Sequence, residues 1–289
     1  MSDILTLREI GSEAIAEILA LSERPDLGRP LAGKGVALLF AKPSARTRNS
    51  MEMAVAQLGG HPVYIQADEV GLGTRETAED IARTLACYHA VIAARVSDHR
   101  HLEQFAAAVE TPILNLLSDS DHPLQGLADL LTIRQLVGRV EGAKIAYVGD
   151  GNNNVARSLA EGCALMGAAL TIASPEEFQL AAPPEGVRQV ASPAEAVAGA
   201  QIVYTDVWVS MGQAEETVRR NRALAGYQVD EALMALSDDA WFMHCLPARR
   251  GEEVDAAVID GPRSAVWRQA ENRMHTARGA LAWILGVQP

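Results

Sequence analysis

Cysteine is scarce in this sequence, with Cys87, Cys163 and Cys245 the only three among 289 residues. An odd number of widely spaced cysteines without a Cys-x-x-Cys pair indicates neither a disulfide framework nor a zinc site. We therefore expect no metal centre and a reducing, cytoplasmic location. Long apolar runs are also missing, because none reaches the roughly 18 residues of a membrane span. The first ten residues lack the basic start and apolar core of a signal peptide.

Positive charge is in short supply. The chain has 25 Lys and Arg against 37 Asp and Glu, a net charge of −12. Nucleic acids and anionic membranes need a broad basic surface, so we expect neither as a partner. A bound anion must instead lie in a local basic pocket. The content of 48% hydrophobic and 21% charged residues is ordinary for a globular protein, and the length fits one large domain or two smaller ones.

Short apolar runs typical of buried strands alternate along the chain with helical patterns. This alternation predicts an α/β fold with mostly parallel sheets that helices cover on both faces, and a ligand site beyond the carboxyl ends of the strands, in a cleft between two domains. The Pro- and Ala-rich stretch 176–197 is interpreted as a surface connection. Strands are predicted at residues 36–40, 61–66, 89–96, 111–117, 144–151, 169–174, 201–208 and 240–247. Helices are predicted at residues 4–21, 45–58, 75–88, 126–137, 155–168 and 271–286.

The segment that follows the first predicted strand combines a helix start with positive charge. Ser44 is a candidate N-cap, and Arg46, Thr47 and Arg48 lie in the first turn behind it. Backbone N–H groups and the helix dipole, together with arginines and a hydroxyl, suit an anion the size of phosphate. An ordinary capped helix with solvated arginines is an equally good interpretation of these residues alone.

Two weaker polar patterns lie far from this one. His122 and Gln125 are one turn apart and could hydrogen-bond one small ligand, although a loop histidine before a helix explains them as well. Glu271, Asn272 and Arg273 begin the last predicted helix, where an exposed arginine is the usual outcome. Neither pattern by itself predicts a site.

A glycine turn follows the strand predicted at 144–151. Gly149 and Gly151 match the start of the dinucleotide pattern G-x-G-x-x-G, but Asn154 replaces its third glycine. A nicotinamide site is therefore weakly indicated. Asn152, Asn153 and Asn154 could instead offer amide groups to a polar ligand or cap the next helix.

Two strand ends carry groups that suit an amine substrate. Asp206 precedes a small polar loop and could bind an ammonium group, although a capping turn has the same pattern. Cys245 could be a reactive thiol, but inert buried cysteines are more common. Neighbouring residues on a strand point to opposite faces, so His244 is not expected to activate Cys245 directly.

The order of these motifs is more specific than any one of them. In this order the sequence resembles the ornithine carbamoyltransferases over nearly its whole length, from about residue 4 to 286. The motifs S-x-R-T-R and H-P-x-Q mark the wider aspartate/ornithine carbamoyltransferase superfamily. The motifs D-x-W-x-S-M-G and H-C-L-P mark its ornithine branch. The matching motifs are S-x-R-T-R at 44–48, Arg95, H-P-x-Q at 122–125, G-D-G-N-N at 149–153, D-x-W-x-S-M-G at 206–212, H-C-L-P at 244–247 and E-N-R at 271–273.

The resemblance implies two domains and a reaction. Residues 1–126, with the C-terminal helix 271–289 returning to them, would bind carbamoyl phosphate, and residues 127–270 would bind ornithine. The reaction would transfer the carbamoyl group to the side-chain amine of L-ornithine, giving L-citrulline and phosphate for arginine biosynthesis, without a cofactor. The family's usual assembly is a homotrimer or a multiple of trimers.

The resemblance also implies roles for single residues. Arg95, His122, Cys245 and Asp206 would take part in the chemistry. The carbamoyl phosphate ligands would be Ser44, Ala45, Arg46, Thr47, Arg95, His122, Gln125 and Arg273. The ornithine ligands would be Asn153, Asp206, Ser210, Met211, Cys245 and Leu246.

Three positions depart from the family pattern. Ala45 replaces the usual threonine, which removes a hydroxyl near the phosphate, and Arg249 replaces a frequent histidine. The segment 177–200 is shorter than usual. Three other functions stay open: transfer to another amine such as acylornithine, putrescine or lysine, a nicotinamide-dependent oxidoreductase, and a non-catalytic relative.

Overall fold

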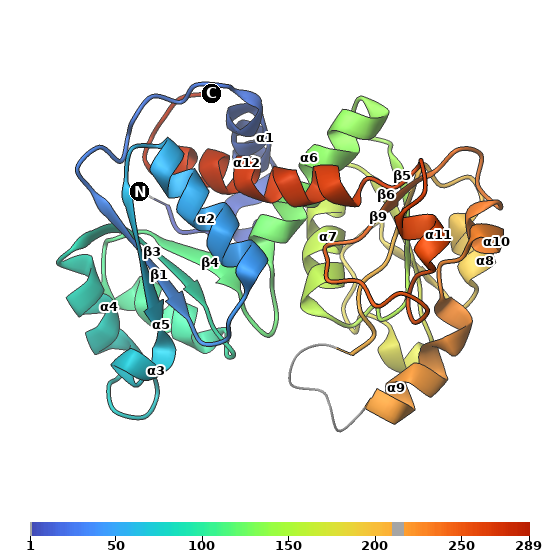
Figure 1. The fold of residues 1–289 in the computed structure, drawn as a ribbon, viewed down its shortest axis with the longest axis horizontal. Helices are drawn as coiled ribbons and strands as arrows, with labels where there is room; N and C mark the ends of the chain where they lie inside the picture. The colour runs from blue at the N-terminus through green and yellow to red at the C-terminus, as the bar shows by residue number, and fades with distance from the viewer. Residues whose placement is uncertain (1, 210–216) are drawn as a thin grey trace. The chain divides into compact units, whose positions relative to one another are not determined.

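Two parallel sheets organise the chain in the computed structural model, which describes residues 2–209 and 217–289 (Figure 1). The chain divides into a first unit, Met1–Ala128 with Glu271–Pro289, and a second unit, Asp129–Ala270. Each sheet lies in one unit and has helices on both faces, as the alternation of strand and helix patterns predicts. No helix of the described ranges is both long and apolar enough to cross a bilayer.

The first sheet has the strand order β2-β1-β3-β4, with all strands parallel. The chain adds β2 on one side of β1 and then β3 and β4 on the other side. The carboxyl ends of β1 and β3 therefore form a switch point, where ligands of such folds bind. Ser44 follows β1, Arg95 ends β3 and His122 follows β4. The strands are β1 (Gly35–Phe40), β2 (His61–Gln66), β3 (His89–Arg95) and β4 (Ile113–Leu117).

Alternating residues of the first sheet bury one face under two helices. Leu39 and Ile92 pack with Ile81 of α4 and Phe105 of α5 in one apolar cluster. Burial of this kind contributes about 25 cal/mol per Å² of apolar surface, so it is the main force that holds these helices to the sheet. The helices of the first unit are α1 (Leu7–Glu23), α2 (Ala45–Gln57), α3 (Ala67–Val70), α4 (Ala78–Ala86) and α5 (Arg100–Ala108), and α6 (Pro123–Val137) and α12 (Val266–Ile284) contribute to both units.

The C-terminal helix α12 returns to the first unit and lies beside α1 (Figure 1). Gly279 permits this close approach, because a Cβ there would lie 2.2 Å from the Ser22 hydroxyl. Arg278 donates to the carbonyl of Arg24 at 2.6 Å, and the Trp283 indole donates to Glu17 at 2.7 Å. These contacts fix the helix that carries Arg273.

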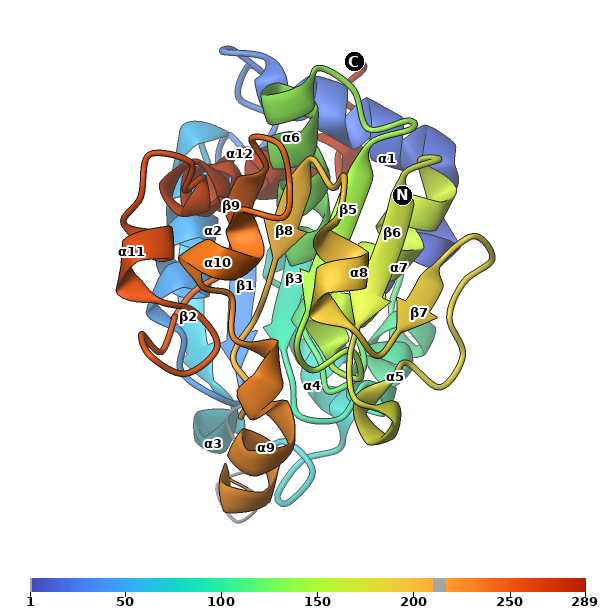
Figure 2. The same cartoon turned by 90° about the vertical axis from the view of Figure 1, so that its right-hand side faces the viewer.

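The second sheet has the order β7-β6-β5-β8-β9 and is also parallel (Figure 2). Tyr147 faces α7 on one side, and Val148 faces α8 and α11 on the other, as strand alternation requires. Its switch point lies between β5 and β8, which the 149–153 turn and Asp206 follow directly. The strands are β5 (Lys144–Val148), β6 (Ala169–Ala173), β7 (Arg188–Val190), β8 (Ile202–Tyr204) and β9 (Trp241–Met243). The helices are α7 (Asn154–Leu165), η1 (Glu176–Phe178), α8 (Pro193–Val197), α9 (Thr217–Leu224), η3 (Ala225–Tyr227), α10 (Glu231–Met234) and α11 (Ala256–Ile259).

Some predicted boundaries are wrong. The stretch 176–197 is not only a surface connection, because it supplies edge strand β7 and helix α8, whose Val197 is fully buried. The last helix begins at Val266 rather than 271, and the first begins at Leu7 rather than 4 because Ile4 pairs with Leu114. Strands β8 and β9 end at residues 204 and 243, so the motifs predicted on them lie in the loops that follow.

Candidate active site

The start of α2 has the predicted cap. The Ser44 hydroxyl oxygen accepts the Thr47 N–H at 3.4 Å, and the two hydroxyl oxygens lie 3.1 Å apart. Thr47 is buried, whereas Ala45 supplies only a methyl group and a backbone N–H. The first turn of a helix presents N–H groups that have no partner within the helix, so this end of α2 is suited to an anion.

The two arginines of this turn differ in their surroundings. Arg48 donates to Glu52 at 2.8 Å, and its guanidinium lies 4.0 Å from the Tyr64 ring centre. Its charge is therefore already paired with the Glu52 carboxylate. Arg46 instead interacts electrostatically with Arg95. Only Arg46 therefore adds its charge to the group at the carboxyl end of the first sheet.

Positive charge converges at this end of the first sheet. Arg95 is buried, and burial together with the Arg46 charge lowers the pKa of its guanidinium to about 10. Its Nε has no hydrogen-bond partner among the residues that the structure describes. Arg273 of α12 is buried as well, and both Arg273 and Arg95 act on His122. Like charges that are buried together repel each other, so an anion bound here would be stabilised by the cluster.

His122 is held as a neutral imidazole. Burial, Arg273 and Arg95 lower its pKa well below 6.5, so at neutral pH it can donate one hydrogen bond without adding charge. Gln125 is buried one turn later, on α6, and its backbone N–H donates to the His122 carbonyl at 3.0 Å. Ser118 braces the preceding loop by accepting the Asp121 N–H at 3.0 Å. The predicted His122 and Gln125 pair thus lies in the same unit as the cation cluster.

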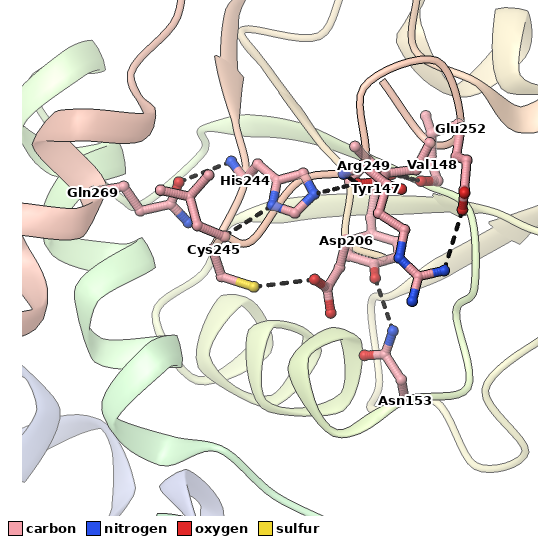
Figure 3. A network of polar contacts seen from close by, with 12 residues as sticks. Tyr147, Val148, Asn153, Asp206, His244, Cys245, Arg249, Glu252 and Gln269 are labelled. Atoms are coloured by element: carbon pink, nitrogen blue, oxygen red, sulfur yellow. Dashed lines mark hydrogen bonds and ion pairs between the residues drawn. The ribbon is translucent and has the colours of Figure 1, made fainter. Parts of the chain in front are cut away.

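A half-buried thiol and a buried carboxylate meet in the second unit (Figure 3). The Cys245 Sγ donates to Oδ1 of Asp206 at 3.2 Å. Burial, the Asp206 charge and the more distant Asp129 raise the pKa of the thiol well above 9, so Cys245 is a protonated donor and not a thiolate. Burial also raises the pKa of Asp206, although the Cys245 hydrogen bond opposes this rise. An ammonium group bound beside Asp206 would stabilise the charged form of this buried carboxylate.

His244 stabilises the loop rather than acting on the thiol. Its Nδ1 accepts the Leu246 N–H at 2.9 Å, which leaves the proton on Nε2 to be donated to Glu253 at 3.1 Å (Figure 3). Glu253 also accepts the Arg249 N–H at 2.6 Å, and both His244 and Glu253 are fully buried. These bonds hold Leu246 at φ +61°, a left-handed conformation that costs a non-glycine residue about 1–3 kcal/mol.

Asn153 caps helix α7. Its side-chain oxygen accepts the Ala156 N–H at 2.8 Å, and its amide group donates to the Asp150 carbonyl at 3.0 Å. The amide group also donates to the Tyr147 hydroxyl at 3.1 Å (Figure 3). The Tyr147 hydroxyl interacts with the Asp206 charge, which helps to raise its pKa. Asn153 therefore belongs to the same polar group as Asp206.

Sequence reasoning missed a set of buried polar residues that are hydrogen-bonded to one another and to the backbone of His244. Asp129 accepts from the Gln269 amide at 2.7 Å and from the Tyr204 hydroxyl at 3.2 Å, and all three are buried. Gln269 also accepts the His244 N–H at 2.9 Å. No local pattern marks these residues, because each is one polar group inside an apolar element. Only their burial together distinguishes them.

Three expectations from the sequence concern the loop after Asp206, the replacement at Arg249 and a nicotinamide site at the glycine turn. Ser210 and Met211 lie outside the described residues. Arg249 is exposed and pairs with Glu252 at 3.3 Å. At the glycine turn, the Gly151 N–H donates to the buried Ser174 hydroxyl, which occupies the end of β6 where a dinucleotide fold carries its ribose-binding acid.

One set of side chains has the donor types of a metal site. Ligand atoms of Asp206, His244 and Cys245 lie within 4.8 Å of one another. Both His244 ring nitrogens are used by Glu253 and Leu246, and the thiol is protonated. Metal binding requires a thiolate and a free imidazole nitrogen, so these residues as they stand do not fit a metal ion.

Comparison with known proteins gives two family matches. The aspartate/ornithine carbamoyltransferase carbamoyl-P binding domain matches residues 2–135, and the Asp/Orn binding domain of the same family matches residues 141–284. An ornithine carbamoyltransferase of Hyperthermus butylicus is 47% identical, over 98% of this chain and 97% of its own. An anabolic ornithine carbamoyltransferase of Pyrococcus furiosus is 42% identical, over 98% and 96%.

Solved structures agree in both fold and sequence. The ornithine carbamoyltransferase of Pyrococcus furiosus superposes with a TM-score of 0.92 at 41% identity, covering 99% of this chain and 97% of its own. That of Thermus thermophilus gives 0.90 at 40% identity, covering 98% of each chain. With both family domains matched in order along one chain, this protein belongs to the aspartate/ornithine carbamoyltransferase family.

Proposed function

We propose that this enzyme transfers the carbamoyl group of carbamoyl phosphate to the side-chain amine of L-ornithine, forming L-citrulline and phosphate. The observation that carries the proposal is the cluster of Arg46, Arg95 and Arg273, in which Arg46 repels the buried Arg95, and Arg95 and Arg273 both lower the pKa of His122. A protein with a net charge of −12 has no general attraction for anions, so this cluster is a specific site for one. The relatives named ornithine carbamoyltransferase support the same reaction.

In this proposal the first unit binds carbamoyl phosphate. The phosphate group accepts hydrogen bonds from the start of α2, through Ser44, Thr47 and the N–H of Ala45, and pairs with Arg46 and Arg273. Gln125 binds the carbamoyl group. Loss of the usual hydroxyl at position 45 leaves the backbone donor in place.

The carbonyl oxygen is stabilised by preorganised donors. Negative charge grows on this oxygen when the amine attacks, and Arg95, His122 and Thr47 are the groups that oppose it. The neutral state of His122 lets it donate a hydrogen bond without being deprotonated by the reaction. One donor of this kind contributes roughly 2.7–4 kcal/mol in comparable sites.

The second unit binds ornithine and prepares its amine. Asp206 pairs with the side-chain ammonium and accepts its proton, because the Cys245 thiol is already protonated and can only donate. The neutral amine then attacks the carbonyl carbon and a tetrahedral intermediate forms. The C–O bond to phosphate breaks, and the second proton of the attacking nitrogen passes to the departing phosphate. The remaining ornithine ligands are Asn153, Ser210, Met211, Cys245 and Leu246.

We further propose a cytoplasmic homotrimer, or a multiple of trimers, that works in arginine biosynthesis. The family resemblance supports the assembly, and the anabolic relative of Pyrococcus furiosus supports the biosynthetic direction. Sedimentation of the purified protein tests the assembly.

The deciding experiment measures carbamoyl transfer to L-ornithine beside acetylornithine, putrescine, lysine and aspartate. A strong preference for ornithine is expected. Activity with only another amine would leave the phosphate site intact and overturn the acceptor, and no activity with any would overturn the enzyme function. Arg46→Gln should raise the KM for carbamoyl phosphate, whereas Arg48→Gln, whose side chain is already paired with Glu52, should not.

A further inference from the structure

Arg220 is a buried arginine that contacts two loops of the second unit. It lies on α9 with 6% of its surface exposed, and its guanidinium forms an ion pair with the equally buried Asp150. Its Nε donates to the carbonyl of Trp208 at 2.7 Å, and its Cζ lies 4.8 Å from the Phe178 ring centre. One guanidinium therefore connects three segments that are distant in the sequence.

The two polar partners belong to the loops that carry the proposed ornithine ligands. Asp150 lies in the turn after β5, where its carbonyl accepts from the Asn153 amide at 3.0 Å. Trp208 lies two residues beyond Asp206, in the loop after β8. These loops leave the two strands that flank the switch point of the second sheet. The Arg220 guanidinium, which binds both loops, thus fixes their spacing.

The neighbouring arginine on α9 shows what an ordinary surface pair looks like here. Arg219 pairs with Glu177, and its side chain is 67% exposed against 7% for Arg220. Exposed pairs contribute little, because water and salt screen them. A buried charge is costly unless it is paired, and the Asp150 carboxylate and the Trp208 carbonyl both contribute to this pairing.

We propose that Arg220 is a positioning residue for the amine acceptor, holding the Asn153 turn and the Asp206 loop at the spacing that fits ornithine. This inference rests on the proposed function. Arg220 acts through Asp150 and Trp208 and does not touch the reacting atoms. Its effect should therefore be on ornithine binding, and carbamoyl phosphate binding, which involves the other unit, should stay as it is.

The test compares Arg220→Lys with Arg219→Gln in steady-state kinetics of the full chain. A lysine keeps the charge but cannot reach both the Asp150 carboxylate and the Trp208 carbonyl. We expect the ornithine KM to rise about tenfold for Arg220→Lys, with the carbamoyl phosphate KM within about twofold of wild type. The Arg219→Gln variant should match wild type in both constants.

A second set of variants separates positioning from stability. Asp150→Asn should raise the ornithine KM as Arg220→Lys does, and the double variant should be no worse than either, because both act through one pair. A lowered thermal midpoint with an unchanged ornithine KM would show a purely structural role and overturn the inference. Equal rises in both KM values would also overturn it. Failure of the wild-type enzyme to form citrulline would instead refute the proposed function, and this inference with it.

Discussion

Replacing Arg95 by methionine should separate activity from stability. The Arg95 charge is buried and repelled by Arg46, and its Nε has no hydrogen-bond partner within residues 2–209 and 217–289. The fall of its pKa from 12.5 to about 10 means that the charged form is disfavoured by on the order of 3 kcal/mol. Methionine has a similar length and no charge, so Arg95→Met should remove most of this cost.

The expected result is a variant that folds at least as stably as wild type and has lost its catalysis. We expect an unfolding midpoint equal to wild type or higher by a few degrees, since about 1 kcal/mol corresponds to roughly 2–4 °C in a chain of this size. The turnover number should fall by about 10²–10³, the usual cost of one oxyanion donor.

Inorganic phosphate provides the matching binding assay. Wild type should gain stability with phosphate, by about 2.7 kcal/mol at a concentration 100 times its Kd, and Arg95→Met should gain much less. Arg100→Gln is the control, because Arg100 is exposed and pairs with Asp98. A loss of about 3–5 kcal/mol in unliganded Arg95→Met, as for a broken buried ion pair, would refute the reasoning. So would an undiminished response to phosphate.

Cys245, His122 and Gly279 each provide a further test. Burial and the neighbouring carboxylate raise the pKa of the Cys245 thiol, so iodoacetamide at pH 8 should alkylate it at least about tenfold more slowly than exposed Cys87, as followed by mass spectrometry; equal rates would contradict a protonated thiol. Burial, with the two nearby arginines, holds the folded-state pKa of His122 below its ordinary 6.5, so the unfolded chain binds more protons below pH 6.5 and the folded chain loses stability there. His122→Asn should therefore lose less stability than wild type between pH 7 and pH 5.5 in thermal unfolding, and identical pH profiles would exclude this role. Gly279→Ala should destabilise by about 1–3 kcal/mol in chemical denaturation, because its Cβ would lie 2.2 Å from the Ser22 hydroxyl; an unchanged midpoint would show that α12 and α1 can move apart at little cost.

Local patterns in the sequence were enough to predict the α/β class and most elements. Strand β2 matches its predicted range of 61–66, and the Ser44 cap of α2 is confirmed, since both depend on a few consecutive residues. The stretch 176–197 was misassigned because edge strand β7 has three residues and composition alone describes such a segment poorly. Its burial depends on strand β6, which pairs with it.

The candidate site divides in the same way. Residue types and their order can be read from the chain alone, which is why the family resemblance could be recognised from motifs such as H-C-L-P at 244–247. It could not determine that Arg95 and Arg273 both act on His122, because that interaction depends on α12 returning to the first unit. Nor could it determine the protonated state of Cys245 or the link made by Arg220. Burial sets the pKa of a thiol and the strength of an ion pair, and burial exists only once distant segments pack together.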